Sequence, residues 1–275
     1  MAKAGIALLG VLVAMALAAG LYPHPPDMPS GPPLAAPDRY HLLGTDDLGV
    51  DVLAQVCHGA RVSLAVSLAT AVLAGGVGGG LGAWAGYVGG WADALLMRVV
   101  DAMLVLPALP LVMLLAAMLG PGLDRVVLVL AVLSWPRPAR VVRAQVLSLR
   151  ERLYVRAARL YGAGTWYMLR RHLIPEVAPL LGASMVKLAG HAVVAEASLA
   201  FLGLGDPSLR SWGSVLYHAT RFPGLYLTPY WRWWMVGPWV ALTALVVALA
   251  LLGLELDRVA HPRLRHGAGT DTGVG

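Results

Sequence analysis

Long apolar runs alternate with short polar segments along this chain. An α-helix needs about 20 apolar residues to cross the hydrocarbon core of a bilayer, and six runs approach or exceed that length. They cover residues 4–21, 62–85, 94–119, a stretch from 126 onward, 177–204 and 233–254. The fourth run is the weakest, because Arg137 directly follows Pro136. The pattern predicts an all-α integral membrane protein with six transmembrane helices.

Prolines interrupt two of these runs. Pro107 and Pro110 lie in the third, and Pro136 and Pro138 lie in the fourth. Proline lacks an amide donor and tends to kink a helix. We therefore expect both helices to be bent where neighbouring protein or a wet cavity satisfies the freed carbonyl groups.

The first run has two interpretations. Residues 1–22 can form a retained transmembrane helix. Lys3, the apolar stretch and the small residues at 16–18 also match a secretory signal peptide. Removal of such a peptide would not change the orientation of the other five runs.

Composition supports a membrane protein. Hydrophobic residues make up 58% of the 275 residues and charged residues only 13%. The net charge of +6 comes from basic residues at the ends of apolar runs, which is typical of membrane topology rather than nucleic-acid binding. Cys57 is the only cysteine, so the chain cannot form an internal disulfide or a cysteine-ligated cluster.

Loop charges predict the orientation. Residues 137–172 contain nine arginines and a single acid, Glu151, whereas residues 22–60 contain one arginine and five aspartates. The positive-inside tendency places the first segment in the cytoplasm and the second outside. Both termini are then cytoplasmic. We expect an extracytoplasmic segment at 23–60, a five-helix core at 61–265 and a flexible tail at 266–275.

The second apolar run is rich in glycine. Its glycines form small-xxx-small pairs, which let two helix backbones approach closely. The packing could lie within the chain or against another subunit. The candidate packing residues are Gly75, Gly79, Gly82 and Gly86.

Residues 150–175 form a basic segment with two predicted short helices. In the first helix, four small or aromatic residues share one face, and Gly162 then ends the helix. A second helix is expected from about 166 to 174, capped by Thr165 and ending before Pro175. The segment could lie on anionic lipid or dock on a partner protein. The face consists of Tyr154, Ala157, Ala158 and Tyr161.

Ionisable residues inside apolar runs are candidates for function, because burying them in lipid is costly. Lys187 and His191 share a helix face, and Glu196 points elsewhere. We take these three as tentative residues of a translocation path. Arg98 and Asp101 are three apart and are expected to pair with each other.

We expect neither a metal site nor a nucleotide site in this chain. The eight histidines form no i, i+4 pair, and a metal needs several converging ligands. The aspartates of residues 44–51 do not follow the calcium-loop spacing, so Thr45 or Asp46 is expected to cap a short helix instead. The chain lacks the G-x-x-x-x-G-K-[ST] phosphate loop.

Several motifs, in order, resemble one family. Arg156-Ala157-Ala158, Gly162 and Leu173-Ile174-Pro175 resemble the "EAA" loop of ABC-importer permeases, with Arg156 in place of the usual glutamate. Four further stretches resemble the oligopeptide, dipeptide and nickel branch, although Val50 stands where that branch usually has arginine. They are HLLGTDDLGVDVLAQVCHGARVSL (41–64), WPRPARVVRAQVLSLRE (135–151), EASLAFLGLGDPSLRSWGSVL (196–216) and LLGLELDRVAHPRLR (251–265).

The resemblance implies a multi-pass permease subunit in a bacterial or archaeal plasma membrane. A sister permease, two cytoplasmic ATPase subunits and an extracytoplasmic substrate-binding protein would complete the transporter. The chain itself would be no enzyme and would hold no cofactor, because ATP and Mg²⁺ belong to the ATPase. Peptides, nickel and other small solutes all remain possible cargo.

By the same resemblance, the ATPase-coupling residues are those of the loop at 150–175. They are Tyr154, Arg156, Ala157, Ala158, Tyr161, Gly162, Leu173 and Pro175. Two other classes of function remain as alternatives. A secondary transporter or channel would need inverted repeats or polar groups along the spans. A membrane enzyme would need a nucleophile with its base, or a metal cluster, at membrane depth.

Overall fold

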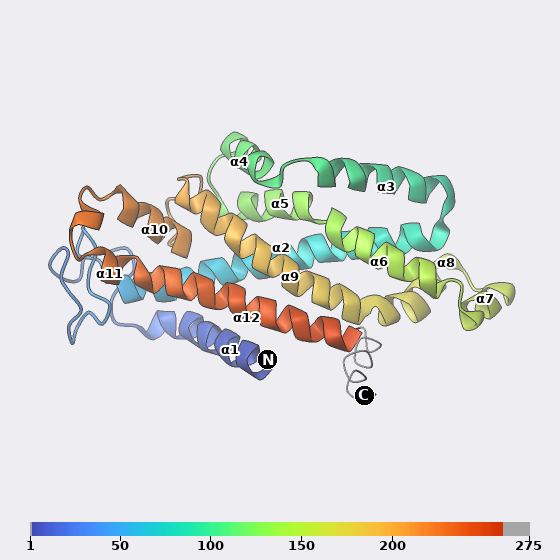
Figure 1. Ribbon diagram of the computed structural model, residues 1–275, viewed down its shortest axis with the longest axis horizontal. Helices are drawn as coiled ribbons and strands as arrows, with labels where there is room; N and C mark the ends of the chain where they lie inside the picture. Colours follow the sequence, from blue (N-terminus) through green and yellow to red (C-terminus); the bar gives the residue numbers. More distant parts are fainter. Residues whose placement is uncertain (1, 261–275) are drawn as a thin grey trace, which may run out of the picture.

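The computed structural model describes residues 2–260, which form an elongated helical bundle (Figure 1). No strand occurs in this range. Four helical segments are long and apolar enough to cross a membrane. They comprise α1 (Ala2–Ala18) with the short helix η1 (Ala19–Leu21), α2 (Val52–Val88), the segment Thr165–Phe201, and α11 (Trp231–Trp234) with α12 (Val236–Ala260).

A fifth candidate span is broken. α3 (Gly90–Val105) and α4 (Ala108–Leu119) are bent by 91° at the two residues between them. Pro107 lies at this break, as the sequence predicts. At this break the chain changes direction, so α4 does not continue along the axis of α3 (Figure 1).

The expected fourth span corresponds to two shorter helices. α5 (Leu123–Ser134) and α6 (Pro136–Leu149) are separated by Trp135 alone. Pro136 is the first residue of α6. A backbone amide at that position makes no hydrogen bond within the helix, so proline is tolerated there. Neither helix is long enough to count as a span by itself, so the total of six spans stays a prediction.

α2 begins ten residues earlier than the apolar run suggests. Asp51 caps it, because its side chain accepts a hydrogen bond from the Ala54 amide at 2.7 Å. The expectation that Thr45 or Asp46 caps this helix is therefore wrong. Asp46 instead accepts the amides of Leu48 and Val50 and forms a turn before the helix.

The helix expected to end before Pro175 continues through it. α8 (Thr165–Met168), the π-helical turn η2 (Leu169–Leu173) and α9 (Ile174–Phe201) form one 37-residue element. Pro175 lies in the first turn of α9, where a proline is tolerated. The turn just before it is π-helical rather than α-helical, and the helix continues through both. Gly164, not Thr165, occupies the cap position of α8.

The bundle has two different ends (Figure 1). At one end, which we call the α7 end, α7 (Leu153–Leu160) and α8 project beyond the end of α12. At the opposite end, which we call the loop end, residues 22–51 lie beside α10 (Trp212–Arg221) and α11. The short helix η3 (Leu225–Leu227) connects α10 to α11.

Candidate functional site

The α7 end is built on a small buried cluster. Val155 is fully buried and packs with residues of α2, α6 and the π-turn, and Ala158 and Ala163 lie partly buried against the same cluster. Leu173 is also fully buried there, whereas Pro175 is exposed. α7 is therefore held to the bundle by one face.

A Schellman motif ends α7. The amide of Gly162 donates to the Arg159 carbonyl at 3.0 Å, and the amide of Ala163 donates to the Ala158 carbonyl at 3.1 Å. Gly162 has φ +82°, a conformation that residues with a Cβ rarely adopt. The glycine therefore sets the angle between α7 and α8.

The exposed face of α7 is rotated from the predicted one. Leu153, Leu160 and Tyr161 are 84%, 88% and 93% exposed, and Ala157 is also exposed. Trp166 on α8 is 71% exposed. We call these five residues the exposed α7–α8 surface. Leu153 and Leu160 could have been found from the sequence, because Leu153, Ala157, Leu160 and Tyr161 also follow helical spacing.

Polar contacts also hold α7 to the bundle. Tyr154 donates a hydrogen bond from its hydroxyl to Glu176, and Arg152 pairs with the same carboxylate at 3.0 Å. Burial and Glu176 raise the pKa of Tyr154. Tyr154 therefore ties α7 to the first turn of α9, whereas the sequence assigned it to a docking face.

Arg156, which stands where the family pattern has glutamate, has a partner. It forms an ion pair with Glu151. The hydrogen bond from Arg156 lowers the pKa of Glu151. Arg159 lies over the ring of Tyr87, 4.8 Å from its centroid, and so connects α7 to the end of α2.

The glycines of α2 pack within the chain. A Cβ on Gly75 or Gly79 would lie 2.4 Å from Met185 or 2.7 Å from Leu181, both on α9. A Cβ on Gly82 would lie 2.3 Å from the Ala139 carbonyl oxygen of α6, and one on Gly86 would meet Arg143 and Val146. These four glycines therefore lie against α6 or α9 of the same chain. Gly76 and Gly80 face open space.

Two ion pairs join α3 to α6. Asp101 pairs with Arg140, and Asp93 forms a two-point pair with Arg143. The expected pair between Arg98 and Asp101 is therefore wrong, because the carboxylate reaches across to another helix. Some arginines that the charge pattern assigned to a cytoplasmic loop thus hold helices together.

The three tentative path residues do not converge. Lys187 pairs with Asp257 of α12, which gives it a structural partner. His191 is exposed on α9. Glu196 is buried, with 6% of its surface exposed, and its Oε2 atom has no hydrogen-bond partner among residues 2–260.

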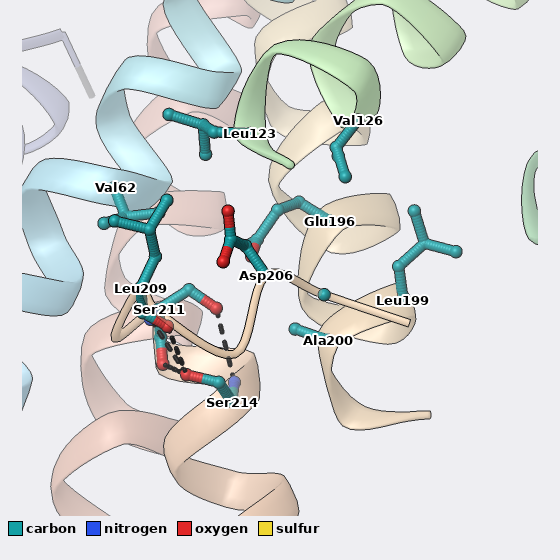
Figure 2. Close-up of a pocket in the computed structure, with 11 residues that line it drawn as sticks. Val62, Leu123, Val126, Glu196, Leu199, Ala200, Asp206, Leu209, Ser211 and Ser214 are labelled. Carbon is teal, nitrogen blue, oxygen red and sulfur yellow. Dashed lines mark hydrogen bonds between the residues drawn. The ribbon is translucent and has the colours of Figure 1, made fainter. Parts of the chain in front are cut away.

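Glu196 lines a small cavity near the loop end (Figure 2). The cavity volume is about 20 Å³, which is enough for one water molecule. Asp206 also lines it, from the loop after α9. Ser63 and Ser211 lie next to the Glu196 carboxyl group. The sequence did not single out Asp206 or these serines, because the loop that brings them to Glu196 is irregular.

The stretch EASLAFLGLGDPSLRSWGSVL has a structural role around this cavity. The indole of Trp212 donates to the Val56 carbonyl at 2.9 Å and packs against Gly59. A Cβ on Gly213 would lie 2.5 Å from the Ala197 carbonyl oxygen. Ser211 and Ser214 form a capping box at the start of α10. The motif therefore locks α10 against α2 and α9.

Comparison with known proteins decides the family. Residues 78–266 match the family described as "Binding-protein-dependent transport system inner membrane component". The chain belongs to this family. It is therefore a membrane permease subunit of an ABC importer, a multi-pass protein of the plasma membrane. Such a permease is a transport subunit, works with a substrate-binding protein and leaves ATP hydrolysis to a partner ATPase.

Relatives of the permease include proteins named for peptide transport. A protein named as a peptide permease in Brucella suis biovar 1 is 37% identical over 230 residues, which is 83% of this chain and 75% of the relative. A protein named as a peptide transport system permease in the same organism is 38% identical over 83% of this chain and 76% of the relative. The dipeptide transport system permease protein DppC of Bacillus subtilis is 34% identical over 83% of this chain and 71% of the relative.

Proposed function

We propose that this permease imports peptides and that its exposed α7–α8 surface docks on the cytoplasmic ATPase. The observation that carries the docking proposal is the exposure of large apolar side chains on a helix that projects from the bundle. Leu160 and Tyr161 are 88% and 93% exposed within the arginine-rich segment at the α7 end. Buried aromatic and aliphatic anchors supply most of the binding energy of protein interfaces.

The remaining partners follow from the family and the charge pattern. We propose a pair of this chain with a sister permease, each forming half of the path, above two ATPase subunits that hold ATP and Mg²⁺. Both chain termini and the α7 end then face the cytoplasm, and the loop end faces the substrate-binding protein. The arginine-rich segment at the α7 end supports this orientation.

The peptide cargo is supported by the printed names of the relatives. Nickel and other small solutes are the alternative cargoes. Uptake by the complete transporter in proteoliposomes, with its binding protein, distinguishes them. We expect ATP-dependent accumulation of a labelled dipeptide or oligopeptide. Accumulation of ⁶³Ni²⁺ alone would replace the peptide cargo, and accumulation without ATP would contradict the importer mechanism.

Docking is tested with Leu160→Asp. The substitution places a charge in the proposed contact, where a desolvated and unpaired charge costs several kcal/mol, roughly a 100-fold loss of affinity. We expect the ATPase to be lost on co-purification while the permease stays folded, because Leu160 makes no buried contact. Leu227→Asp is the matched control, since Leu227 is 92% exposed at the loop end. Equal ATPase recovery and equal uptake by both variants would refute docking through α7.

A further inference from the structure

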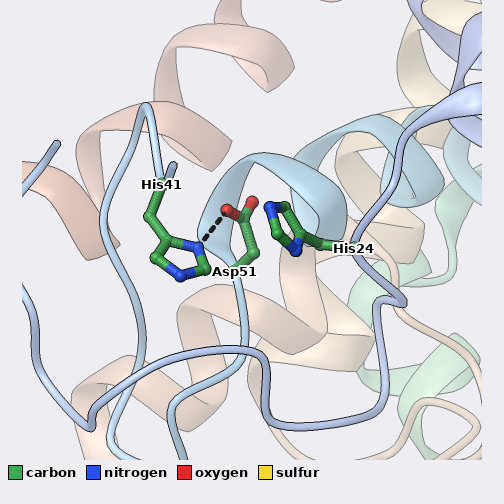
Figure 3. Close-up of side chains that lie close together, drawn as sticks. All are labelled: His24, His41 and Asp51. Carbon is green, nitrogen blue, oxygen red and sulfur yellow. Dashed lines mark hydrogen bonds and ion pairs between the residues drawn. The ribbon is translucent and has the colours of Figure 1, made fainter. Parts of the chain in front are cut away.

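Two histidines and an aspartate from separate segments meet at the loop end (Figure 3). His24 follows α1, His41 lies in the loop, and Asp51 caps α2. One nitrogen of each imidazole and one carboxylate oxygen lie within 4.8 Å of one another. None of these side chains belongs to the coupling or path residues described above.

The cluster is largely built and buried. His41 and Asp51 are 5% and 0% exposed, and the His41 Nδ1 atom lies 2.8 Å from Asp51 Oδ2. The other carboxylate oxygen, Oδ1, accepts the Ala54 amide. The hydroxyl of Tyr22 points to Oδ2 at 3.5 Å. Asp51 thus keeps a fixed orientation and presents one oxygen to the two imidazoles.

Both rings are oriented by the backbone. Gly31 lies against the Nε2 side of His41, where a Cβ would come within 2.5 Å, so the Nδ1 side faces Asp51. His24 Nε2 lies 3.1 Å from the Tyr40 carbonyl oxygen. A carbonyl only accepts, so Nε2 carries the proton and the other nitrogen of the neutral ring keeps its lone pair. Histidine ligands of metals are commonly oriented by such a carbonyl.

We propose that His24, His41 and Asp51 bind a divalent first-row transition-metal ion, with Zn²⁺ as the representative case. Imidazole and carboxylate together suit Zn²⁺, Co²⁺, Ni²⁺ or Cu²⁺ better than Mg²⁺ or Ca²⁺. The ion replaces the proton between His41 Nδ1 and Asp51 Oδ2, and that proton moves to Nε2. Three protein ligands leave a position for water.

Binding requires a small movement of one ligand. Metal–ligand bonds of about 2.0–2.2 Å place tetrahedral ligand atoms roughly 3.4 Å apart. His24 must therefore move inward, and it is the one member of the cluster that is not buried. The bound ion joins the segment after α1 to the first turn of α2, so it stabilises the loop end.

The test uses the full-length chain without a polyhistidine tag, purified in detergent and stripped with EDTA. Zn²⁺ is titrated by calorimetry, and Co²⁺ by its visible absorption. We expect one saturable site per chain and an increase in the thermal midpoint with Zn²⁺. Since outer-shell partners alone contribute about 10–100-fold to metal affinity, His24→Ala should weaken Zn²⁺ binding by at least about tenfold.

His218→Ala is the matched control, because His218 is an exposed histidine at the same end but outside the cluster. It should bind Zn²⁺ as the parent does. His41→Ala and Asp51→Asn should also lose binding, with circular dichroism confirming that they remain helical. If His24→Ala and the parent bind Zn²⁺ equally, or if the parent has no saturable site, the proposal is wrong.

Discussion

The two ends of this permease differ in which side chains they expose and which they bury. The α7 end exposes large apolar side chains and buries only Val155 and its neighbours. The loop end buries polar side chains instead, among them His41, Asp46 and Asp51. Burying polar groups is favourable only when their hydrogen bonds are made within the chain.

The difference lies in whether the chain itself satisfies the polar groups of each end. At the loop end, the Asp46 carboxylate accepts two amides and the side chain of Gln55, so its hydrogen-bonding capacity is used internally. At the α7 end, the exposed α7–α8 surface leaves apolar area in water, and a partner is needed to cover it. Under the docking proposal, the ATPase covers this surface.

Among the changes that test this comparison, Asp46→Ala should have the largest effect on stability. It leaves the Leu48 and Val50 amides and the Gln55 side chain without their acceptor. Losing buried bonds to a charged group should reduce the free energy of unfolding by about 4 kcal/mol. Asp47→Ala is the neighbouring control and should change it by less than about 0.5 kcal/mol, because Asp47 is exposed. Thermal unfolding in detergent compares the two, and equal midpoints would show that the loop end does not depend on this network.

A smaller effect is expected from Gly162→Val at the α7 end. Left-handed backbone costs a residue with a Cβ about 1–2 kcal/mol, and no atom lies within 4 Å to add a clash. Because the exposed α7–α8 surface contributes little to the core, α7 should open locally while the bundle stays folded. Hydrogen exchange should accelerate by roughly tenfold in residues 153–162 only.

Gly164→Val supplies the control for that experiment. Gly164 has φ −68° and equally open surroundings, so valine fits there without strain. Uniform acceleration across all helices in Gly162→Val, or the same acceleration in Gly164→Val, would contradict a local role of the turn.

The smallest expected effect is a loss of stability at alkaline pH through the ionisation of Tyr22. Burial and then the charge of Asp51 raise the pKa of Tyr22 from 10.0 to about 12. The folded state thus favours the neutral phenol, and this stabilisation is present below pH 10 and is lost as pH rises toward 12. Absorbance at 295 nm should show one late-ionising tyrosine that is missing in Tyr22→Phe. Identical titrations of the two proteins would show that Tyr22 is not held against Asp51.

The sequence predicted the helical architecture and the broken third span well, because long apolar runs and prolines have few other structural interpretations. It placed the start of α2 wrongly, since residues 52–61 are mixed in polarity and this part of α2 packs against other helices of the chain. It also paired Arg98 with Asp101 because local spacing was the only information available. The true partner, Arg140, is 39 residues away and depends on how α3 packs on α6.

The candidate sites divide in the same way. Gly162 was identified from the sequence because a glycine after a helix has a local cause. The cluster of His24, His41 and Asp51 was not singled out, since its members are 17 and 10 residues apart and no spacing rule connects them. Only the path of residues 22–51 brings His24 to Asp51. Of the predicted face of α7, Ala157 and Tyr161 are exposed and Ala158 is partly buried, whereas the hydrogen bond from Tyr154 to Glu176 could not be predicted from local spacing.

The π-turn at 169–173 fixes the rotational phase of the long element that follows it. An α-helix advances about 100° per residue, so deleting one residue from this turn would rotate the whole of α9 by that angle relative to α8. Lys187 would leave Asp257, and Glu196 would swing out of its cavity, although both lie far from the deletion. Trp166 and Glu196 thus belong to one continuous helical element, so the register of the π-turn decides what both of them contact.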